Sequence, residues 1–162
     1  NEQGIDAARL AAIKKKTGSI KNYESAEKLP HKEIFGLPVD ILIPAAVTDV
    51  IHESNKNAIR AKIIVEGANI PMSEAIEDEL SKKGILIVPD FVANAGGVIS
   101  SWAESKGIGA KNMFRAVEEK ISRATKTVLA RSIKTGESPR LAALAIAHAI
   151  VERAGAKRKH IF

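Results

Sequence analysis

The sequence predicts an α/β protein: a three-stranded, doubly wound parallel sheet with flanking helices and two long helices at the carboxyl end. Two observations support this class. Three short apolar runs alternate with helical patterns through residue 102. Polar and apolar residues do not alternate within these runs, as they would in a strand with one face in solvent, so both faces of each strand should be buried. Beyond residue 110 only helical periodicity remains. Because parallel strands need crossover connections, helices should cover both faces of the sheet.

The first part of the chain predicts one helix and one buried strand. Asp6 can cap a helix over residues 7–16 ("AARLAAIKKK"), and Gly18 follows near its end. Residues 19–37 favour a loop with a short helix near "HKEIFG". The apolar run over residues 39–46 ("VDILIPAA") then predicts a fully buried strand.

Two more strands follow with a helix between them. Residues 47–61 are helical or irregular, and residues 62–69 ("KIIVEGAN") predict the second strand. Residues 73–83 ("SEAIEDELSKK") predict a helix whose early acidic residues suit the helix dipole, and we interpret that acidic run as a solvated face. Gly84 ends this helix, and residues 85–90 predict the third strand.

The remainder predicts helices. The segment 91–102 ("FVANAGGVISSW") leads from the third strand into a helix, and "GIGAKN" at 107–112 is a helix break rather than a phosphate loop, because no strand precedes it. Gly136 ends the first long helix, and Ser138 with Pro139 begins the second. Its segment 141–151 ("LAALAIAHAIV") is apolar all round and predicts a well-buried helix. The apolar stripe of the first long helix consists of Phe114, Val117, Ile121, Ala124 and Val128.

The chemistry is expected at the carboxyl ends of the strands, where open parallel sheets bind their ligands. The three strand ends are "PAA", "EGAN" and "PDFVANAGG", all with small residues and two with asparagine. Small residues leave room for a flat ligand, and an asparagine amide offers both a donor and an acceptor to a ribose hydroxyl or a carboxamide. Any one of these ends alone would be an ordinary turn, so the prediction depends on all three together.

These strand ends carry a resemblance to a known family. The blocks "DILIPAA", "KIIVEGANIPMSEA" and "GILIVPDFVANAGGVISS" resemble, in order and spacing, the carboxyl-terminal half of the glutamate/leucine/phenylalanine/valine dehydrogenases. The lead-in "GIDAARLAAIKKKTGSI" resembles the segment after the second Rossmann strand of that family. The resemblance implies that residues 1–162 form the second half of an NAD(P)-binding Rossmann domain with carboxyl-terminal helices, most like glutamate dehydrogenase.

The resemblance also implies roles for particular residues, in an enzyme that deaminates an amino acid to a 2-oxo acid with NAD or NADP. Ala45 and Ala46 would lie near the adenosine side of the cofactor, and Asn69 near the nicotinamide ribose. Asn94 would lie near the nicotinamide ring, where Gly96 and Gly97 would leave room for the ring because they have no side chains. Val98 and Ser101 would bind the substrate, and a serine at this place favours glutamate. Ile70 departs from the family pattern, in which a glycine is common.

Other family features do not occur in this sequence. No stretch provides the G-x-G-x-x-G turn that holds the pyrophosphate, and the resemblance places the catalytic lysines and aspartate in a separate amino-terminal domain. We therefore expect no catalytic residues here, an inactive chain when alone, and weak or no binding of the cofactor. The strand at 39–46 would lack its usual neighbour, so we expect a homo-oligomer or association with the missing amino-terminal half. The start at Asn1 rather than a methionine favours a piece of a longer protein.

Composition limits the alternatives. The chain contains no cysteine, which excludes disulfides and thiolate metal sites, and its four histidines form no metal-binding motif. His148 is therefore expected to be a buried, hydrogen-bonded side chain. The absence of an apolar run of ~18 residues and of a signal peptide predicts a cytoplasmic protein that does not contact membranes.

Two other functions stay open. One is a non-catalytic nucleotide-binding or interaction module derived from the family. The other, weaker, is nucleic-acid binding, based on the net charge of +6 and the basic tail "AKRKHIF". We expect no nucleic-acid partner, because only 4% of the residues are aromatic and base-stacking platforms need rings.

Overall fold

The protein is described here by a computed structural model, which covers the backbone of residues 4–158 and the side chains of residues 4–155. The chain divides into two compact units, with the boundary between Ile34 and Phe35. The basic tail 156–162, including His160, lies outside the described side chains.

The first unit contains helix α1 (Ala7–Thr17) and the short 3-10 helix η1 (Ile20–Asn22). The predicted ends of α1 are confirmed: the Asp6 carboxylate accepts a hydrogen bond from Arg9 N at 3.0 Å, and Gly18 follows with a left-handed backbone at φ 74°. Among the described residues of this unit, Tyr23 alone is buried, and its hydroxyl accepts a hydrogen bond from Asp6 N at 3.1 Å. A second 3-10 helix, η2 (His31–Gly36), crosses the unit boundary, where a short helix was predicted.

The second unit is built on a parallel sheet in the order β1-β2-β3, which confirms the predicted fold class. The strands are β1 (Ile41–Leu42), β2 (Ile63–Val65) and β3 (Leu86–Val88), and Ile64 pairs with both Leu42 and Ile87. Each strand is shorter than the apolar run that predicted it. Pro44 and Pro89 explain the ends of two strands, because proline has no backbone N–H for the ladder.

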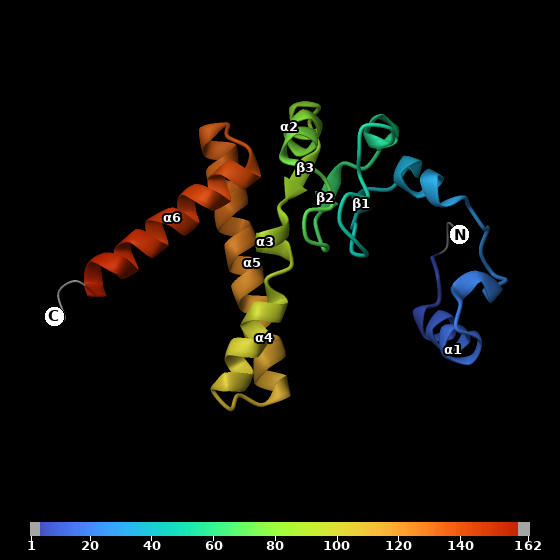
Figure 1. Cartoon of the computed structure of the whole chain (residues 1–162), viewed down its shortest axis with the longest axis horizontal. Helices are drawn as coiled ribbons and strands as arrows, with labels where there is room; N and C mark the ends of the chain where they lie inside the picture. The colour runs from blue at the N-terminus through green and yellow to red at the C-terminus, as the bar shows by residue number, and fades with distance from the viewer. Residues whose placement is uncertain (1–3, 159–162) are drawn as a thin grey trace. The chain divides into compact units, whose positions relative to one another are not determined.

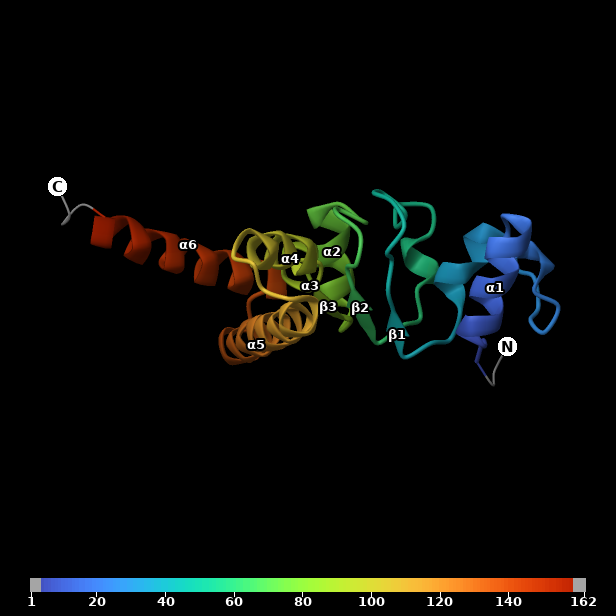
Figure 2. The same cartoon turned by 90° about the horizontal axis from the view of Figure 1, so that it is seen from below.

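Helices cover the two faces of this sheet unequally (Figures 1 and 2). On one face, Ile64 and Ile87 pack with Ile76 and Leu80 of helix α2 (Glu74–Lys82), whose N-cap is Ser73. On the other face, Val88 packs with residues of the last two helices. That second cover lies over β3, while Ile41 of β1 remains 52% exposed.

The described part of this unit also contains the short 3-10 helix η3 (Lys56–Ala58) and four more α-helices: α3 (Asp90–Ala93), α4 (Gly96–Ser105), α5 (Ala110–Thr135) and α6 (Pro139–Arg158). The turn after α4 is the helix break predicted at 107–112, and α5 then runs back along α4 (Figure 1). Gly136 ends α5 with φ 74°, as predicted. No helix in the described part of the chain is both long and apolar enough to cross a membrane.

The prediction that α6 is well buried is wrong. Its first turns bury Ala142 and Ala143, but Leu141, Ile150 and Val151 are 56%, 60% and 70% exposed. The helix packs on β3 and α5 only near its start, and its second half extends away from α5 (Figure 1). The stripe on α5 is also only partly covered, since Val128 is buried while Phe114 is 67% exposed.

Candidate functional site

A hollow of about 430 Å³ lies beyond the carboxyl ends of β1 and β2, beside the end of α3. It brings together four of the six residues predicted to bind a cofactor, from three separate segments of the chain. Its lining consists of Ala45, Ala46, Val47, Thr48, Gly67, Ala68, Asn69 and Asn94. The position agrees with the general rule for ligands of open parallel sheets.

The floor of the hollow is formed by two backbone segments that lie unusually close together. A Cβ atom added to Gly67 would lie 2.9 Å from the Cβ of Ala45, a separation that real Cβ atoms do not show. Ala68 N also donates a hydrogen bond to Pro44 O at 2.8 Å, which ties the same two segments together. Glycine at position 67 is therefore required by this close approach.

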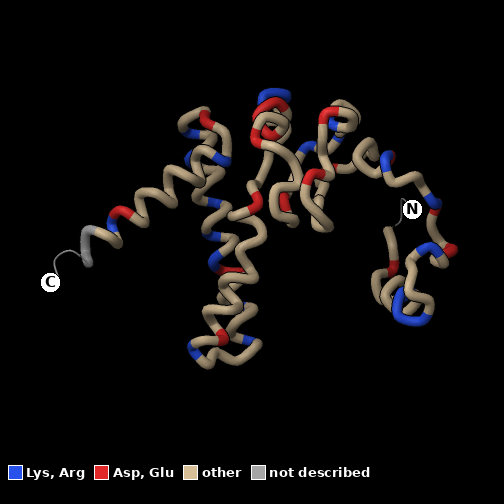
Figure 3. The backbone as a smooth tube through the Cα atoms, in the orientation of Figure 1, with Lys and Arg blue, Asp and Glu red and all other residues tan. Residues whose placement is uncertain are grey.

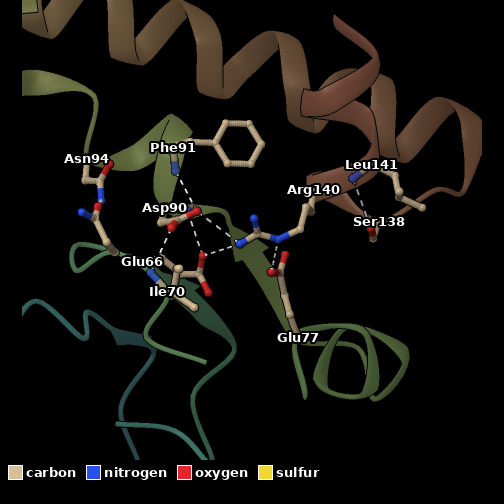
Figure 4. A network of polar contacts seen from close by, with 10 residues as sticks. Glu66, Ile70, Glu77, Asp90, Phe91, Asn94, Ser138, Arg140 and Leu141 are labelled. Atoms are coloured by element: carbon tan, nitrogen blue, oxygen red, sulfur yellow. Dashed lines mark hydrogen bonds and ion pairs between the residues drawn. The ribbon is translucent and has the colours of Figure 1, made fainter. Parts of the chain in front are cut away.

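Two asparagine side chains meet at the rim. Asn94 Nδ2 donates to Asn69 Oδ1 at 2.6 Å, which links the end of α3 to the segment after β2 (Figure 4). This bond uses one donor of Asn94 and the acceptor of Asn69. Asn69 Nδ2 and Asn94 Oδ1 have no partner among the described residues, so the pair presents an unpaired amide NH2 group and an unpaired amide oxygen.

Next to Asn69, the backbone adopts a strained turn. Ile70 has φ 48°, in the left-handed region that β-branched residues avoid. Three contacts hold it: Ile70 N donates to Asp90 Oδ2 at 2.9 Å, Ile70 O accepts from Asp49 N at 3.0 Å, and the following Pro71 O accepts from Ile51 N at 2.9 Å.

Asp90 belongs to a group of four charged residues, three buried carboxylates and a partly buried arginine, which we call the Arg140 cluster: Glu66, Glu77, Asp90 and Arg140 (Figure 4). Arg140 Nη2 lies 3.0 Å from Glu66 Oε2 and 3.2 Å from Asp90 Oδ1, and Arg140 Nε donates to Glu77. Glu66 Oε2 also accepts from Asp90 N at 2.8 Å. The cluster thus joins the end of β2, helix α2, the start of α3 and the first turn of α6.

Three carboxyl groups share one guanidinium in this cluster. The pKa values of Glu66 and Glu77 are raised, and the pKa of Asp90 is lowered. Burial and then the neighbouring Glu77 raise the pKa of Glu66 to about 7, against the lowering effect of Asp90 N–H and Arg140. Burial also raises the pKa of Glu77. For Asp90, burial is outweighed by hydrogen bonds from Ile70 N and Phe91 N and by Arg140, so its pKa is lowered. One oxygen of Glu66 and one of Glu77 find no donor within the described residues.

Comparison with known proteins identifies the family. The profile of the Glutamate/Leucine/Phenylalanine/Valine dehydrogenase family matches residues 1–159. The chain belongs to this family. It is 44% identical over 133 residues to a glutamate dehydrogenase of Aeropyrum pernix, an alignment that covers 78% of this chain and 32% of that protein. An NADP-specific glutamate dehydrogenase of Saccharolobus shibatae is 40% identical over 112 residues, covering 67% of this chain and 26% of that one.

Solved structures of the family agree with the fold. A hetero-hexameric glutamate dehydrogenase of Thermus thermophilus, in its Leu-bound form, superposes with a TM-score of 0.81 at 26% identity, over 98% of this chain and 38% of that chain. An L-tryptophan dehydrogenase of Nostoc punctiforme superposes with a TM-score of 0.74 at 26% identity, over 92% and 43%. The aligned part of this chain thus spans about a quarter to a third of the length of the two glutamate dehydrogenases compared by sequence.

The other predicted site residues lie on α4, outside the lining of the hollow. Gly96 opens this helix and faces α5, where an added Cβ would lie 3.4 Å from Val117. Gly97 and Val98 are exposed, Val98 by 77%. Ser101 Oγ donates to Gly97 O at 3.1 Å. The assignment of Gly96 and Gly97 to the cofactor and of Val98 and Ser101 to the substrate stays a prediction.

Sequence reasoning missed Gly67 and the whole Arg140 cluster. The acidic run of α2 was interpreted as solvated, and this is wrong for Glu77, which is only 3% exposed because it pairs with Arg140. Gly67 was visible as part of "EGAN", but its closeness to Ala45 depends on strand packing. Glu77 and Glu66 lie 63 and 74 residues before Arg140 in the chain, so no local sequence pattern predicts that they pair with it.

Within residues 4–155, the histidines and the charge pattern indicate no second site. His148 is exposed on α6, so the expectation of a buried histidine there is wrong. No group of three or more potential metal ligands occurs among the residues described. Basic positions are spread over helices that include α1, α2, α5 and α6, with acidic positions beside many of them (Figure 3).

Proposed function

We propose that this chain forms part of the NAD- or NADP-binding domain of an amino-acid dehydrogenase that acts on glutamate. The observation that carries the proposal is the hollow at the carboxyl ends of the strands, whose lining includes Asn69 and Asn94. Family membership supports the reaction class, and the names of the relatives above support glutamate and a nicotinamide cofactor.

The groups at the rim fit a nicotinamide nucleotide. Asn69 Nδ2 and Asn94 Oδ1 offer the donor and acceptor that a carboxamide or a ribose hydroxyl needs. Ala45 and Ala46 have small side chains, and Gly67 has none, so a flat group can approach the backbone here.

When bound, the nicotinamide would supply the hydride acceptor for oxidation of the amino acid. The contribution of this chain is to orient: Asn94 fixes the ring end, and Asn69 fixes Asn94 and the adjoining ribose. Orientation of this kind lowers a barrier because the reacting atoms are held at near-attack distance. Ser101 and Val98 are proposed to contact the glutamate side chain.

The first test uses the chain alone. Because the sequence contains no G-x-G-x-x-G turn, we expect a Kd for NAD or NADP no tighter than about millimolar, or about −4 kcal/mol. Titration followed by the side-chain amide resonances of Asn69 and Asn94 measures it. Asn94→Ala should weaken binding by about 5-fold, the value of one ordinary hydrogen bond, whereas Asn112→Ala, an exposed control on α5, should not.

The same sample tests for catalysis. With glutamate and either cofactor, we expect no sustained formation of reduced cofactor above the blank, measured by absorbance. Turnover by this chain alone would contradict the proposed division of labour between segments. Unperturbed Asn69 and Asn94 resonances at saturating cofactor would instead favour a non-catalytic interaction module.

We also propose that the second unit associates through the edge of β1. Within the described residues, β1 pairs only with β2, and the apolar side chains of Ile41 and Ile43 beside that edge are 52% and 59% exposed. An open strand edge with exposed apolar residues recruits another strand. The partner is a second copy or an amino-terminal segment of the same enzyme, and the hetero-hexameric assembly of the Thermus thermophilus protein supports an oligomer.

A further inference from the structure

The Arg140 cluster lies directly behind the rim of the hollow but lines no part of it. Arg140 stands in the first turn of α6, and its guanidinium reaches Glu66 at the end of β2 and Asp90 at the start of α3 (Figure 4). Glu66 is fully buried and Glu77 is 3% exposed. Removing several charges from water is costly, so such a cluster calls for a role other than simple stability.

We propose that Arg140 is a positioning residue for the cofactor-binding hollow, because it fixes Asp90, and Asp90 holds the Asn69–Ile70 turn in place. This inference rests on the proposed function of the hollow. It deepens that function by adding residues that touch no cofactor yet determine where Asn69 lies.

Asp90 connects the cluster to the hollow through both carboxylate oxygens. Oδ1 accepts from Arg140 and from Phe91 N, while Oδ2 accepts from Ile70 N at 2.9 Å. Asp90 O also accepts from Asn94 N at 2.8 Å. One residue therefore holds the backbone of both segments that carry the rim asparagines, and their side chains meet at 2.6 Å.

The turn needs this support because its backbone is strained. Ile70 is β-branched and adopts φ 48°, and its side chain is 58% exposed, so side-chain packing contributes little to keeping it there. The charged acceptor Asp90 supplies a strong bond to Ile70 N, and Arg140 and Glu66 fix the acceptor itself.

The test measures amide hydrogen exchange of Ile70 relative to Ile64, a fully buried residue of β2. Their ratio of rates separates loosening of the turn from global unfolding. In Arg140→Met we expect the ratio to rise about 10-fold or more, as for loss of a hydrogen bond to a charged group, and by less in Arg140→Lys. Arg131→Met is the matched control, because it breaks the exposed Arg131–Glu137 pair and should leave the ratio unchanged.

A second variant keeps the proposal testable if Arg140→Met does not fold. Glu66→Gln preserves the shape and the acceptor for Asp90 N. In the wild type the ratio should rise between about pH 6 and 8, because ionisation of Glu66 places another negative charge beside Glu77 and Asp90, which share Arg140. In Glu66→Gln it should stay flat. A ratio that does not change in Arg140→Met, or that responds to pH equally in Glu66→Gln, would overturn the proposal.

Cofactor titration distinguishes this proposal from the proposed function. If Arg140→Met loosens Ile70 and weakens NAD or NADP binding, while Arg131→Met does neither, both stand. If Asn94→Ala weakens binding but Arg140→Met does not, the positioning role is wrong and the proposed function survives. If the turn loosens in Arg140→Met but no variant and no cofactor perturbs the rim asparagines, the proposed function fails instead.

Discussion

At the scale of single residues, the turn after Asn69 contains backbone strain at Ile70 that contacts with neighbouring segments stabilise. Ile70 takes a backbone conformation that costs about 1–3 kcal/mol for a residue with a branched Cβ. Glycine adopts it freely. We therefore expect Ile70→Gly to raise the free energy of unfolding by up to about 1 kcal/mol, after the greater freedom of glycine in the unfolded chain is subtracted.

Urea denaturation measures this change. Gly84→Ala provides a control of opposite sign, because Gly84 has φ 91° with open space around it, so an alanine there gains only strain. A less stable Ile70→Gly variant would show that the isoleucine side chain makes a contribution larger than the strain.

At the scale of secondary-structure elements, β1 is the strand whose surroundings are incomplete. We expect the chain to self-associate with increasing concentration in sedimentation velocity, unless another segment of the enzyme occupies this edge. Ile43→Lys should shift the chain toward monomer, because a charge beside an open edge prevents strand pairing. Ile133→Lys changes an isoleucine on α5 that is even more exposed, at 79%, and should not alter association. A monomeric wild type at high concentration would contradict the prediction.

The sequence predicted the ends of secondary-structure elements better than it predicted their burial or their long-range contacts. Helix ends followed from local chemistry, as at Asp6 and Gly136, because capping involves neighbours in the chain. The exposure of α6 could not be predicted. Its segment 141–151 is apolar on every side, so the sequence does not indicate which face is covered, and the elements that cover it are distant in the chain. The Arg140 cluster was hidden for the same reason: its members are distant in sequence.

The candidate site was partly predictable because parallel strands end at a common edge. Ala45, Ala46, Asn69 and Asn94 therefore gathered around one hollow. Gly67 and Ile70 acquire their importance only from the close approach of two strands and from Asp90, which sequence patterns do not encode.

At the scale of the whole molecule, burial of Glu66 links stability to pH. Its pKa rises from 4.5 to about 7 on folding, so the folded state binds an extra proton between those values. The contribution of Glu66 to stability is then fully present below about pH 4.5 and is lost as the pH rises through 7, by up to about 3 kcal/mol. Glu77 acts in the same direction. Urea denaturation at several pH values should show this decline, and Glu66→Gln should reduce it. Stability that rises between pH 5 and 7 would contradict it.

The contact between Ala45 and Gly67 has a consequence for how the family can vary. The Cβ of Ala45 leaves no space for a second one at position 67, but the Cα of Ala45 lies 3.4 Å from that point, an ordinary contact distance. The two strand ends thus have room for one methyl group between them, and either position can carry it. Gly67→Ala alone should destabilise the protein by about 1–3 kcal/mol, as overpacking does, while Gly67→Ala with Ala45→Gly should recover most of the loss in urea denaturation. Among homologous chains, the two sites should then covary as a pair that keeps a constant volume.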